Sequence, residues 1–234
     1  MLATRCRLLR RLLRRRIDGW AATRRNVVLV QIGSHDGVSN DPFSDHLDAH
    51  ADWQAVLVEP IPLHFESLKR RRPDGRFTLV QAAITDHDGQ VDMTMVTRKA
   101  GMPEWVDQIN SIDPEHVLKH ATTVDGLKDA MTSVKVAALT FDSLLDSCGV
   151  EAFDALHIDT EGHDAVILAS VDFARFKPAL VMYEHRHLSQ SARIASNRIL
   201  TDAGYRLHRS CMDTLALRRE AERISGRVFK RGSK

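Results

Sequence analysis

The sequence predicts an α/β fold with a mostly parallel, twisted sheet, helices on both faces and a C-terminal antiparallel strand. Short apolar runs such as residues 27–32 (VVLVQI) and 179–183 (ALVMY) alternate with helical patterns. Runs of this kind are typical of strands that are buried on both faces. Polar clusters directly follow five of the runs, at the edge where a parallel sheet binds its ligands.

The first half of the chain alternates strands and helices. The helix expected over residues 62–72 begins with a proline in its first turn and ends with basic side chains. Residues 82–96 are expected to form a loop and a hairpin, because Asp88-Gly89 is a strong turn signal. The other elements expected here are strands 27–32, 55–58 and 77–80 and helix 43–49.

The second half continues the alternation after an irregular segment. Residues 98–133 show weak periodicity, and we expect an excursion over the sheet, a lid or acceptor-binding segment with a short helix from Pro114. Thr140 and Gly149 are suitable residues to begin and end a helix over 141–148. The other elements expected are strands 134–139, 155–158 and 179–183, helices 165–170 and 189–203, and an antiparallel pair from 205–209 and 214–217.

Composition excludes several classes of protein. Apolar residues make up 43% and charged residues 27% of the chain, which is typical of globular domains. The net charge of +2 argues against nucleic acid as the main partner. No apolar run reaches the roughly 18–20 residues that span a bilayer. Cys6, Cys148 and Cys211 are sparse and unpaired in the sequence, which favours a reducing, cytoplasmic location without a disulfide framework or thiolate zinc site.

The chain ends differ from the α/β domain expected over residues 26–217. Residues 1–25 are expected to form a basic helix, with seven arginines between positions 5 and 16 and leucines near helical spacing. We favour packing of the leucines on the domain, while weak contact with an anionic membrane surface stays open. Residues 218–234 are expected to form a charged tail.

A glycine-containing loop and a distant acid predict a nucleoside site. Gly33 and Gly37 flank a turn between the first strand and the first helix, where glycine allows close approach of a ligand. Glu59 ends the next strand, a placement typical of an acid that accepts hydrogen bonds from ribose hydroxyls. The sequence has neither a G-x-G-x-x-G motif nor a P-loop lysine, so a ligand without pyrophosphate is favoured over a nicotinamide dinucleotide.

Several segments together resemble the FkbM-type methyltransferases. They are VVLVQIGSHDG, VLVEP, LVQAAITDHDGQV, ALTFDSLL, FDALHIDTEGHDAVIL and PALVMYEH, which lie between about residues 26 and 185. The resemblance implies a Rossmann-like class I methyltransferase fold with S-adenosylmethionine as the methyl donor. It also implies cofactor contacts from Gly33, Ser34, His35, Asp36, Gly37, Glu59, Pro60, Ala83, Ile84 and Asp159, with Asp86 near the adenine and Asn110-Ser111 bordering the active site.

Gln31 departs from the pattern of that family. It stands where these proteins usually have an acidic residue at the end of the first strand. An amide still accepts a hydrogen bond but gives up a charged contact to the methionine ammonium. His35 and Asp36 are the residues expected to compensate.

Methyl transfer to a hydroxyl needs a base or a metal that lowers the pKa of the hydroxyl. His163 is the first choice for the base, followed by Glu161 and Asp159. By resemblance to sugar O-methyltransferases of related fold, Asp159, Glu184 and His185 could hold Mg²⁺ or another divalent metal. Histidine suits zinc, manganese or iron better than magnesium, and direct hydrogen bonding of these residues to the substrate remains the alternative.

Other histidines carry weaker signals. His116 and His120 have the four-residue spacing of helical metal ligands, but solvated helix positions are the commoner explanation. His157 lies within an expected strand and is interpreted as a core histidine with satisfied hydrogen bonds.

These observations predict an O-methyltransferase that uses S-adenosylmethionine. The resemblance implies a sugar hydroxyl as acceptor, on a saccharide, polysaccharide, glycolipid or glycosylated metabolite. Two alternatives stay open: a catalytically silent nucleoside-binding module, and a methyltransferase of a non-sugar small molecule. Formation of a homodimer is also left open.

Overall fold

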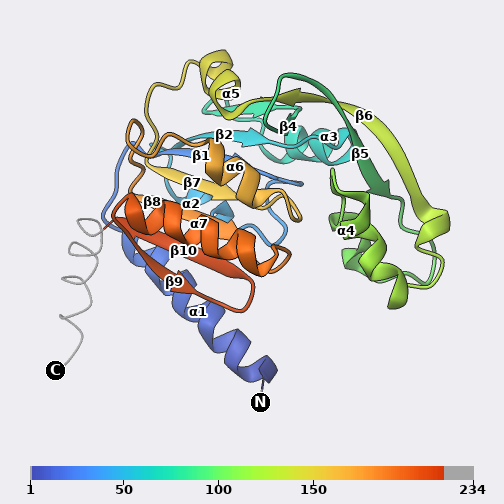
Figure 1. The fold of residues 1–234 in the computed structure, drawn as a ribbon. Helices are drawn as coiled ribbons and strands as arrows, with labels where there is room; N and C mark the ends of the chain where they lie inside the picture. The colour runs from blue at the N-terminus through green and yellow to red at the C-terminus, as the bar shows by residue number, and fades with distance from the viewer. Residues whose placement is uncertain (1, 219–234) are drawn as a thin grey trace.

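The computed structural model describes residues 2–218, so all but the first residue of the expected tail 218–234 lies outside the described residues. Seven strands form one sheet in the order β3-β2-β1-β7-β8-β10-β9, and β10 alone runs opposite to the other six (Figure 1). The predicted fold class is confirmed. The strands are β1 Val28–Ile32, β2 Gln54–Val58, β3 Phe77–Val80, β7 Ala155–Ile158, β8 Leu180–Glu184, β9 Tyr205–Arg209 and β10 Asp213–Arg218.

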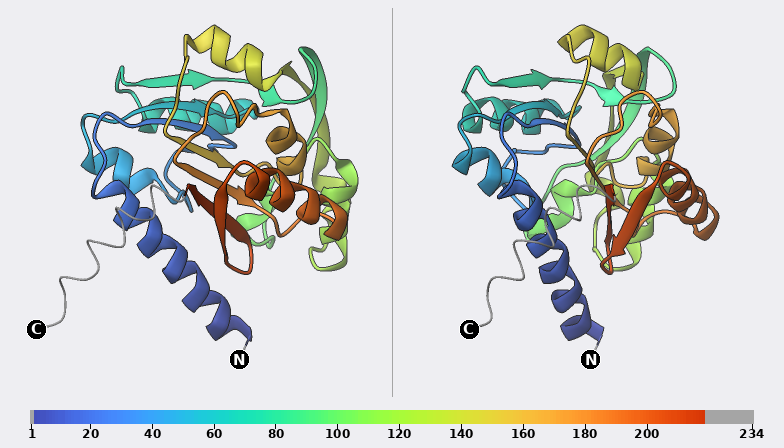
Figure 2. Two further views of the ribbon diagram at one scale, coloured as in Figure 1. Left: turned by 60° about the vertical axis from the view of Figure 1, so that its left-hand side comes forward. Right: turned by 90° about the vertical axis from the view of Figure 1, so that its left-hand side faces the viewer.

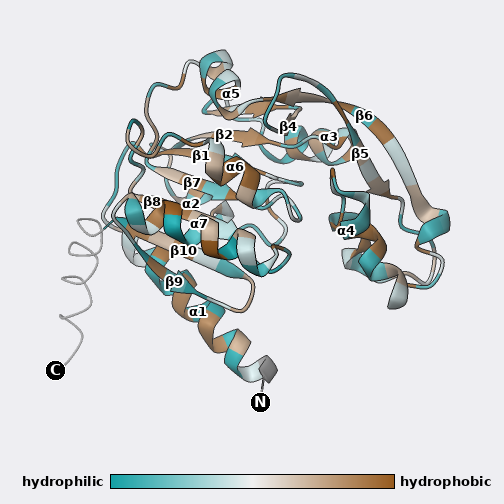
Figure 3. Ribbon diagram, viewed as in Figure 1, coloured by the Kyte–Doolittle hydropathy of each residue, from teal (hydrophilic) through white to brown (hydrophobic). Residues whose placement is uncertain are grey.

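Helices cover both faces of this sheet because side chains alternate between the faces along each strand. On β1, Val30 and Ile32 pack with α5, α6 and α7, whereas Leu29 packs with α1, α2 and α3. Figure 3 shows the apolar strands between these helices. The helices are α1 Leu2–Ala21, α2 Ser44–Ala49, α3 Pro62–Arg71, α5 Phe141–Cys148, α6 Asp164–Ser170 and α7 Gln190–Asp202.

A second sheet corrects the hairpin expected over residues 82–96. Strands β4 (Ala83–Ile84) and β5 (Gly89–Val96) do not pair with each other; each pairs with β6 (Met131–Leu139), which lies between them. The Asp88 carboxylate explains the difference, because it accepts hydrogen bonds from the Thr140 amide and the Ser143 hydroxyl, both at 2.7 Å. The turn is therefore attached to the start of α5 and closes no local hairpin.

The excursion between β5 and β6 has its own small core. The short helix α4 (Pro114–Leu118) begins at Pro114 as expected, with the Asp113 side chain as its N-cap. Three short 3-10 helices complete the segment: Glu104–Gln108, Lys119–Thr122 and Lys128–Ala130. The buried apolar residues of the excursion, together with Val96 of β5, form a separate cluster: Val106, Ile109, Val117, Val124, Leu127 and Ala130.

Helix α1 is long and extends from the body of the domain (Figure 2). Its C-terminal half buries Leu13, Ile17 and Trp20 against the sheet, whereas Leu8 and Leu12 remain exposed. The expected leucine face is therefore only partly covered. Within residues 2–218, no helix combines the length and apolar character needed to cross a membrane.

A disulfide joins Cys6 of α1 to Cys211 in the turn between β9 and β10, with the Cα atoms 5.4 Å apart. The expectation of no disulfide was wrong. The two cysteines are 205 residues apart in sequence, and only the packing of α1 beside β9 brings them together. The spacing of the cysteines in the sequence does not predict such a pair.

The disulfide gives a direct chemical prediction. Protein purified without reductant and then denatured should show one reactive thiol per chain, that of Cys148. After reduction, all three cysteines of the sequence should react. Three reactive thiols before reduction would show that Cys6 and Cys211 are not joined.

Candidate active site

The carboxyl ends of β1 and β7 form the centre of the site. The two strands are neighbours, and the sheet order reverses direction between them, which is where open α/β sheets bind ligands. Gly33 follows β1 with φ +83°, and a Cβ atom there would lie 1.7 Å from the carbonyl oxygen of Asp159. Only glycine allows the two chain segments to lie this close.

Glu59 connects this turn to the end of β2. Its carboxylate accepts hydrogen bonds from the His35 amide at 2.8 Å and the Ile61 amide at 2.9 Å. Burial raises the pKa of Glu59 to about 7, and the two backbone donors partly offset that effect. A buried carboxylate with remaining lone pairs can accept hydrogen bonds from ribose hydroxyls.

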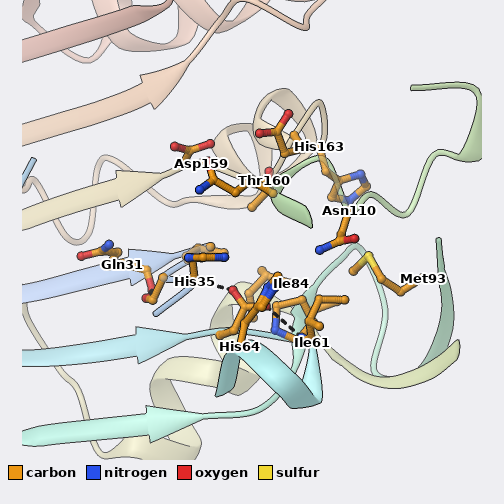
Figure 4. Close-up of a pocket in the computed structure, with 18 of the residues that line it drawn as sticks. Gln31, His35, Ile61, His64, Ile84, Met93, Asn110, Asp159, Thr160 and His163 are labelled. Atoms are coloured by element: carbon orange, nitrogen blue, oxygen red, sulfur yellow. Dashed lines mark hydrogen bonds and ion pairs between the residues drawn. The ribbon is translucent and has the colours of Figure 1, made fainter. Parts of the chain in front are cut away.

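A cavity opens between these elements (Figure 4). Asp159, Thr160 and His163 lie on one side of it, and Ile61 and His64 lie on the other (Figure 4). Most residues that the sequence assigned to the cofactor line this cavity: Gly33, Ser34, His35, Glu59, Pro60, Ala83, Ile84 and Asp159.

Asp36 and Gly37 serve the loop itself and do not line the cavity. The Asp36 carboxylate accepts hydrogen bonds from the amides of Val38 and Ser39 and from the Ser39 hydroxyl. Burial acts to raise the pKa of Asp36, but these bonds bring it down to about 2. The Gly37 carbonyl accepts from the buried guanidinium of Arg72. Both residues shape the turn that presents their neighbours.

Asp41 is a cavity residue that the sequence did not reveal. Gln31 is buried, and its Oε1 has no hydrogen-bond partner; the same holds for Oδ2 of Asp41. Burial raises the pKa of Asp41 to about 6, and the Gln31 amide lowers it in part. The carboxylate of Asp41 therefore lies beside Gln31, which stands where the family usually has an acid. The residues expected from the sequence to compensate were His35 and Asp36. No spacing rule predicts how the loop after β1 folds back.

Three carboxylates meet beyond β7 and β8. Oxygen atoms of Asp159, Glu161 and Glu184 lie within 4.8 Å of one another. The Asp159 side chain borders the open cavity. Desolvation of its carboxylate by the surrounding protein raises its pKa well above the usual value, and repulsion from Glu161 raises it further. Burial and the charge of Asp159 likewise raise the pKa of Glu184. Asp159 and Glu184 are therefore two strongly perturbed carboxylates of the site.

His185 does not join this group, contrary to the expected trio of Asp159, Glu184 and His185. Its Nδ1 lies 2.9 Å from the Thr214 hydroxyl of β10. Consecutive residues of an extended chain point to opposite sides, so Glu184 and His185 cannot both face Asp159. Among the described residues, Glu161 takes the place that the sequence gave to His185.

Asp164 connects the chain segments that carry Asp159, Glu161 and Glu184. It is fully buried at the start of α6 and accepts hydrogen bonds from the Thr160 hydroxyl at 3.0 Å and the Glu184 amide at 3.1 Å. Burial raises its pKa to about 7. Asp164 thus connects the segment after β7 to the end of β8.

Two other histidines lie at or near the site. His163, expected as the general base, borders the cavity; its Nε2 is buried without a hydrogen-bond partner, and burial lowers the pKa of the ring. His116 was expected at a solvated helix position but is buried against Glu161. The helix that carries it is short and packs inward from the excursion.

His157 is a core residue as expected, but its Nδ1 has no hydrogen-bond partner. Burial lowers its pKa from 6.5 to about 4. The unfolded chain binds a proton near pH 6.5 while the folded chain resists it, so stability is lost as the pH falls through this window. Between about pH 8 and about pH 5, the free energy of unfolding should fall by about 2 kcal/mol because of this single group.

Substitution of His157 tests this expectation. The free energy of unfolding of His157→Leu should depend less on pH than that of the wild type, by about 2 kcal/mol over the same range. Urea unfolding at a series of pH values measures it. Parallel stability curves for the two proteins would contradict the assignment.

A second cavity joins the first. Arg10, Arg11 and Arg14 of α1 lie on one wall of it, and Glu184 and Asp213 lie on another. Both cavities are lined by Asn40, Asp41, Gln108, His157, Asp159 and Glu161. The site therefore consists of two adjoining spaces that share a carboxylate-bearing wall.

Comparison of structures supports this fold. The chain is similar to methyltransferase FkbM from Methylobacillus flagellatus KT, with 14% identity, a TM-score of 0.52 and coverage of 82% of this chain and 43% of that chain. This chain thus spans less than half the length of that relative. It also resembles precorrin-6y C5,15-methyltransferase from Geobacter metallireducens GS-15 (11% identity, TM-score 0.46, 87% of each chain). A comparison with curated proteins gave no significant match.

The sequence profile of the methyltransferase FkbM domain matches residues 31–207, which is most of the chain and includes every residue shared by the two cavities. The seven-stranded sheet with its reversed strand β10 is the class I methyltransferase fold. The chain belongs to the FkbM family of S-adenosylmethionine-dependent methyltransferases.

Proposed function

We propose that this protein methylates a hydroxyl oxygen of a sugar, with the donor in the first cavity and the acceptor in the second. The observation that carries the proposal is the junction of the two cavities at Asp159 and Glu161. A methyl transferase must bring donor and acceptor together at one point. The junction offers such a point and places carboxylates beside it.

The residues of the first cavity fit S-adenosylmethionine. Gly33 and Ser34 line this cavity at the end of β1, and Glu59 offers acceptors for ribose hydroxyls. The unpaired oxygens of Gln31 and Asp41 suit an ammonium group, which has only donors to offer. Ala83 and Ile84 provide an apolar wall for the adenine.

The carboxylates at the junction would accept the proton of the acceptor hydroxyl. When bound, S-adenosylmethionine supplies a methyl group whose bond to sulfur breaks as its bond to the acceptor oxygen forms. Asp159 is the preferred base because its carboxylate borders both cavities, at the junction where donor and acceptor would meet. Glu161 borders both cavities as well, whereas His163 borders only the first.

The walls of the second cavity suit a polyhydroxylated acceptor. The guanidinium groups of Arg10, Arg11 and Arg14 donate hydrogen bonds, and the carboxylates of Glu184 and Asp213 accept them. A sugar presents hydroxyls that both donate and accept. This pairing, together with the membership of the FkbM family, favours a saccharide over an apolar small molecule.

Calorimetric titration with S-adenosylmethionine and S-adenosylhomocysteine is the first test. Transfer of a labelled methyl group is then measured against three panels of acceptors: mono- and oligosaccharides, non-sugar alcohols, and amines. Binding of both nucleosides with transfer to a saccharide hydroxyl, located by mass spectrometry, is the expected result. Transfer only to the other panels would refute the sugar acceptor, and binding without any transfer would favour a catalytically silent module.

A further inference from the structure

Three side chains from different parts of the chain converge beside the carboxylate group. His116 comes from α4, Glu161 follows β7 and His187 follows β8. Oε2 of Glu161 lies 3.2 Å from Nε2 of His116 and 3.4 Å from Nε2 of His187. One ligating atom of each residue lies within 4.8 Å of the others.

The contact of His116 with Glu161 lies at the upper end of hydrogen-bond lengths, about 2.7–3.2 Å, and that of His187 is longer. Two ligands of a tetrahedral zinc ion, each about 2.0–2.1 Å from the metal, lie about 3.3 Å apart. The two distances from Glu161 therefore correspond to the edges of a coordination polyhedron. The rings of His116 and His187 are nearly perpendicular, with centroids 4.5 Å apart, so neither blocks the other nitrogen.

The carboxylates beside the three residues are incompletely paired. Oε2 of Glu184 is buried without a hydrogen-bond partner and lies 3.5 Å from Nε2 of His187. Asp159 lies on the other side of Glu161 in a second group of possible metal ligands. Buried carboxylates that repel one another are costly unless a cation accompanies them. A divalent ion next to Glu161 would supply that charge.

The backbone holds Glu161 in place for such a role. Its φ of +52° is unusual for a residue with a side chain, and such conformations are concentrated at functional sites. The Ser111 hydroxyl donates a hydrogen bond of 2.9 Å to the Glu161 carbonyl. The excursion therefore contributes both a ligand, His116, and a support for the central carboxylate.

We infer that His116, Glu161 and His187 bind a divalent transition-metal ion of the class that prefers imidazole, such as Zn²⁺. Two imidazoles and one carboxylate disfavour Mg²⁺ and Ca²⁺, which select oxygen ligands. The site is distinct from the combination of Asp159, Glu184 and His185. It would join the excursion to the sheet, and Glu161 places it beside the junction proposed for methyl transfer. The inference does not depend on the acceptor being a sugar.

The test uses the full chain after treatment with a chelator. Zn²⁺ binding is measured by calorimetry, and Co²⁺ binding by its visible absorption, which reports coordination number. Loss of an outer-shell partner weakens metal binding by 10–100-fold, so loss of a direct ligand in His116→Ala or His187→Ala should weaken it by at least about 100-fold. His120→Ala and His185→Ala are matched controls that remove neighbouring imidazoles and should retain the affinity.

Binding of S-adenosylhomocysteine to the same samples shows that each variant is folded and separates the two proposals. Zn²⁺ binding that is lost only in the His116 and His187 variants supports the metal site, whatever the outcome of the methyl transfer assay. Zn²⁺ and Co²⁺ affinities that are unchanged in the His116→Ala, His187→Ala double variant would overturn it. Mg²⁺ binding that requires Glu184 but neither histidine would also overturn it, in favour of an all-oxygen site.

Discussion

Replacement of Gly33 by alanine is expected to abolish binding of S-adenosylmethionine and to lower the free energy of unfolding by more than about 3 kcal/mol. The added Cβ would lie 1.7 Å from the carbonyl oxygen of Asp159, which is backbone and cannot rotate away. The φ of +83° adds a further penalty. The ends of β1 and β7 would have to separate, which would displace the donor loop and the carboxylates together.

Gly149→Ala is the matched control for this variant. Gly149 also has a positive φ, +66°, but a Cβ there meets no atom within 4 Å. The Gly149→Ala substitution should therefore lower the free energy of unfolding only by the backbone penalty of about 1–2 kcal/mol, and it should leave cofactor binding intact. Urea unfolding and calorimetric titration of both variants separate the effect of φ from that of the close approach. Equal behaviour of the two variants would show that the contact of Gly33 with Asp159 is unimportant.

Asp159→Asn is expected to reduce kcat for methyl transfer by at least about 100-fold, the usual contribution of a general base. Asparagine keeps the size of the side chain and a carbonyl oxygen but cannot take up the proton of the acceptor. Because Glu161 and Asp164 repel the charge of Asp159, its removal should not lower the free energy of unfolding. Affinity for S-adenosylhomocysteine should change much less than kcat.

The control for this variant is Asp213→Asn, since Asp213 lines the second cavity but not the first. Its loss should raise KM for the acceptor more than it lowers kcat. Initial rates at saturating donor, measured with the preferred acceptor over a range of concentrations, distinguish the two patterns. An Asp159→Asn enzyme with normal kcat would assign the proton transfer to another group, with Glu161 next to be tested.

The centre of the sheet could be predicted because β1, β2, β7 and β8 are almost wholly buried and so appear as continuous apolar runs. The ends of those runs then place Gly33, Glu59 and Asp159 at one edge without any knowledge of side-chain directions. The roles of Glu161 and His185 could not be assigned in this way. They depend on which side of the chain faces the cavity after the strand has ended, and Glu161 has an uncommon backbone conformation.

Contacts between segments that are far apart in the chain could not be predicted from the sequence either. Asp41 reaches Gln31 only because the loop between β1 and α2 folds back toward the end of β1. His116 is buried only because the excursion packs against the segment after β7. A weak periodicity, as in residues 98–133, indicates the absence of a long regular element but does not say where the segment lies.

The bond between Cys6 and Cys211 closes residues 6–211 into a covalent ring. Every strand of both sheets except β10 belongs to the ring, as do all residues of the two cavities apart from Met212 and Asp213. A ring of this size restricts the denatured chain, with a loop-closure contribution of about 5 kcal/mol. A protease that cuts the ring once therefore releases no fragment from it, and the two pieces migrate together until the disulfide is reduced.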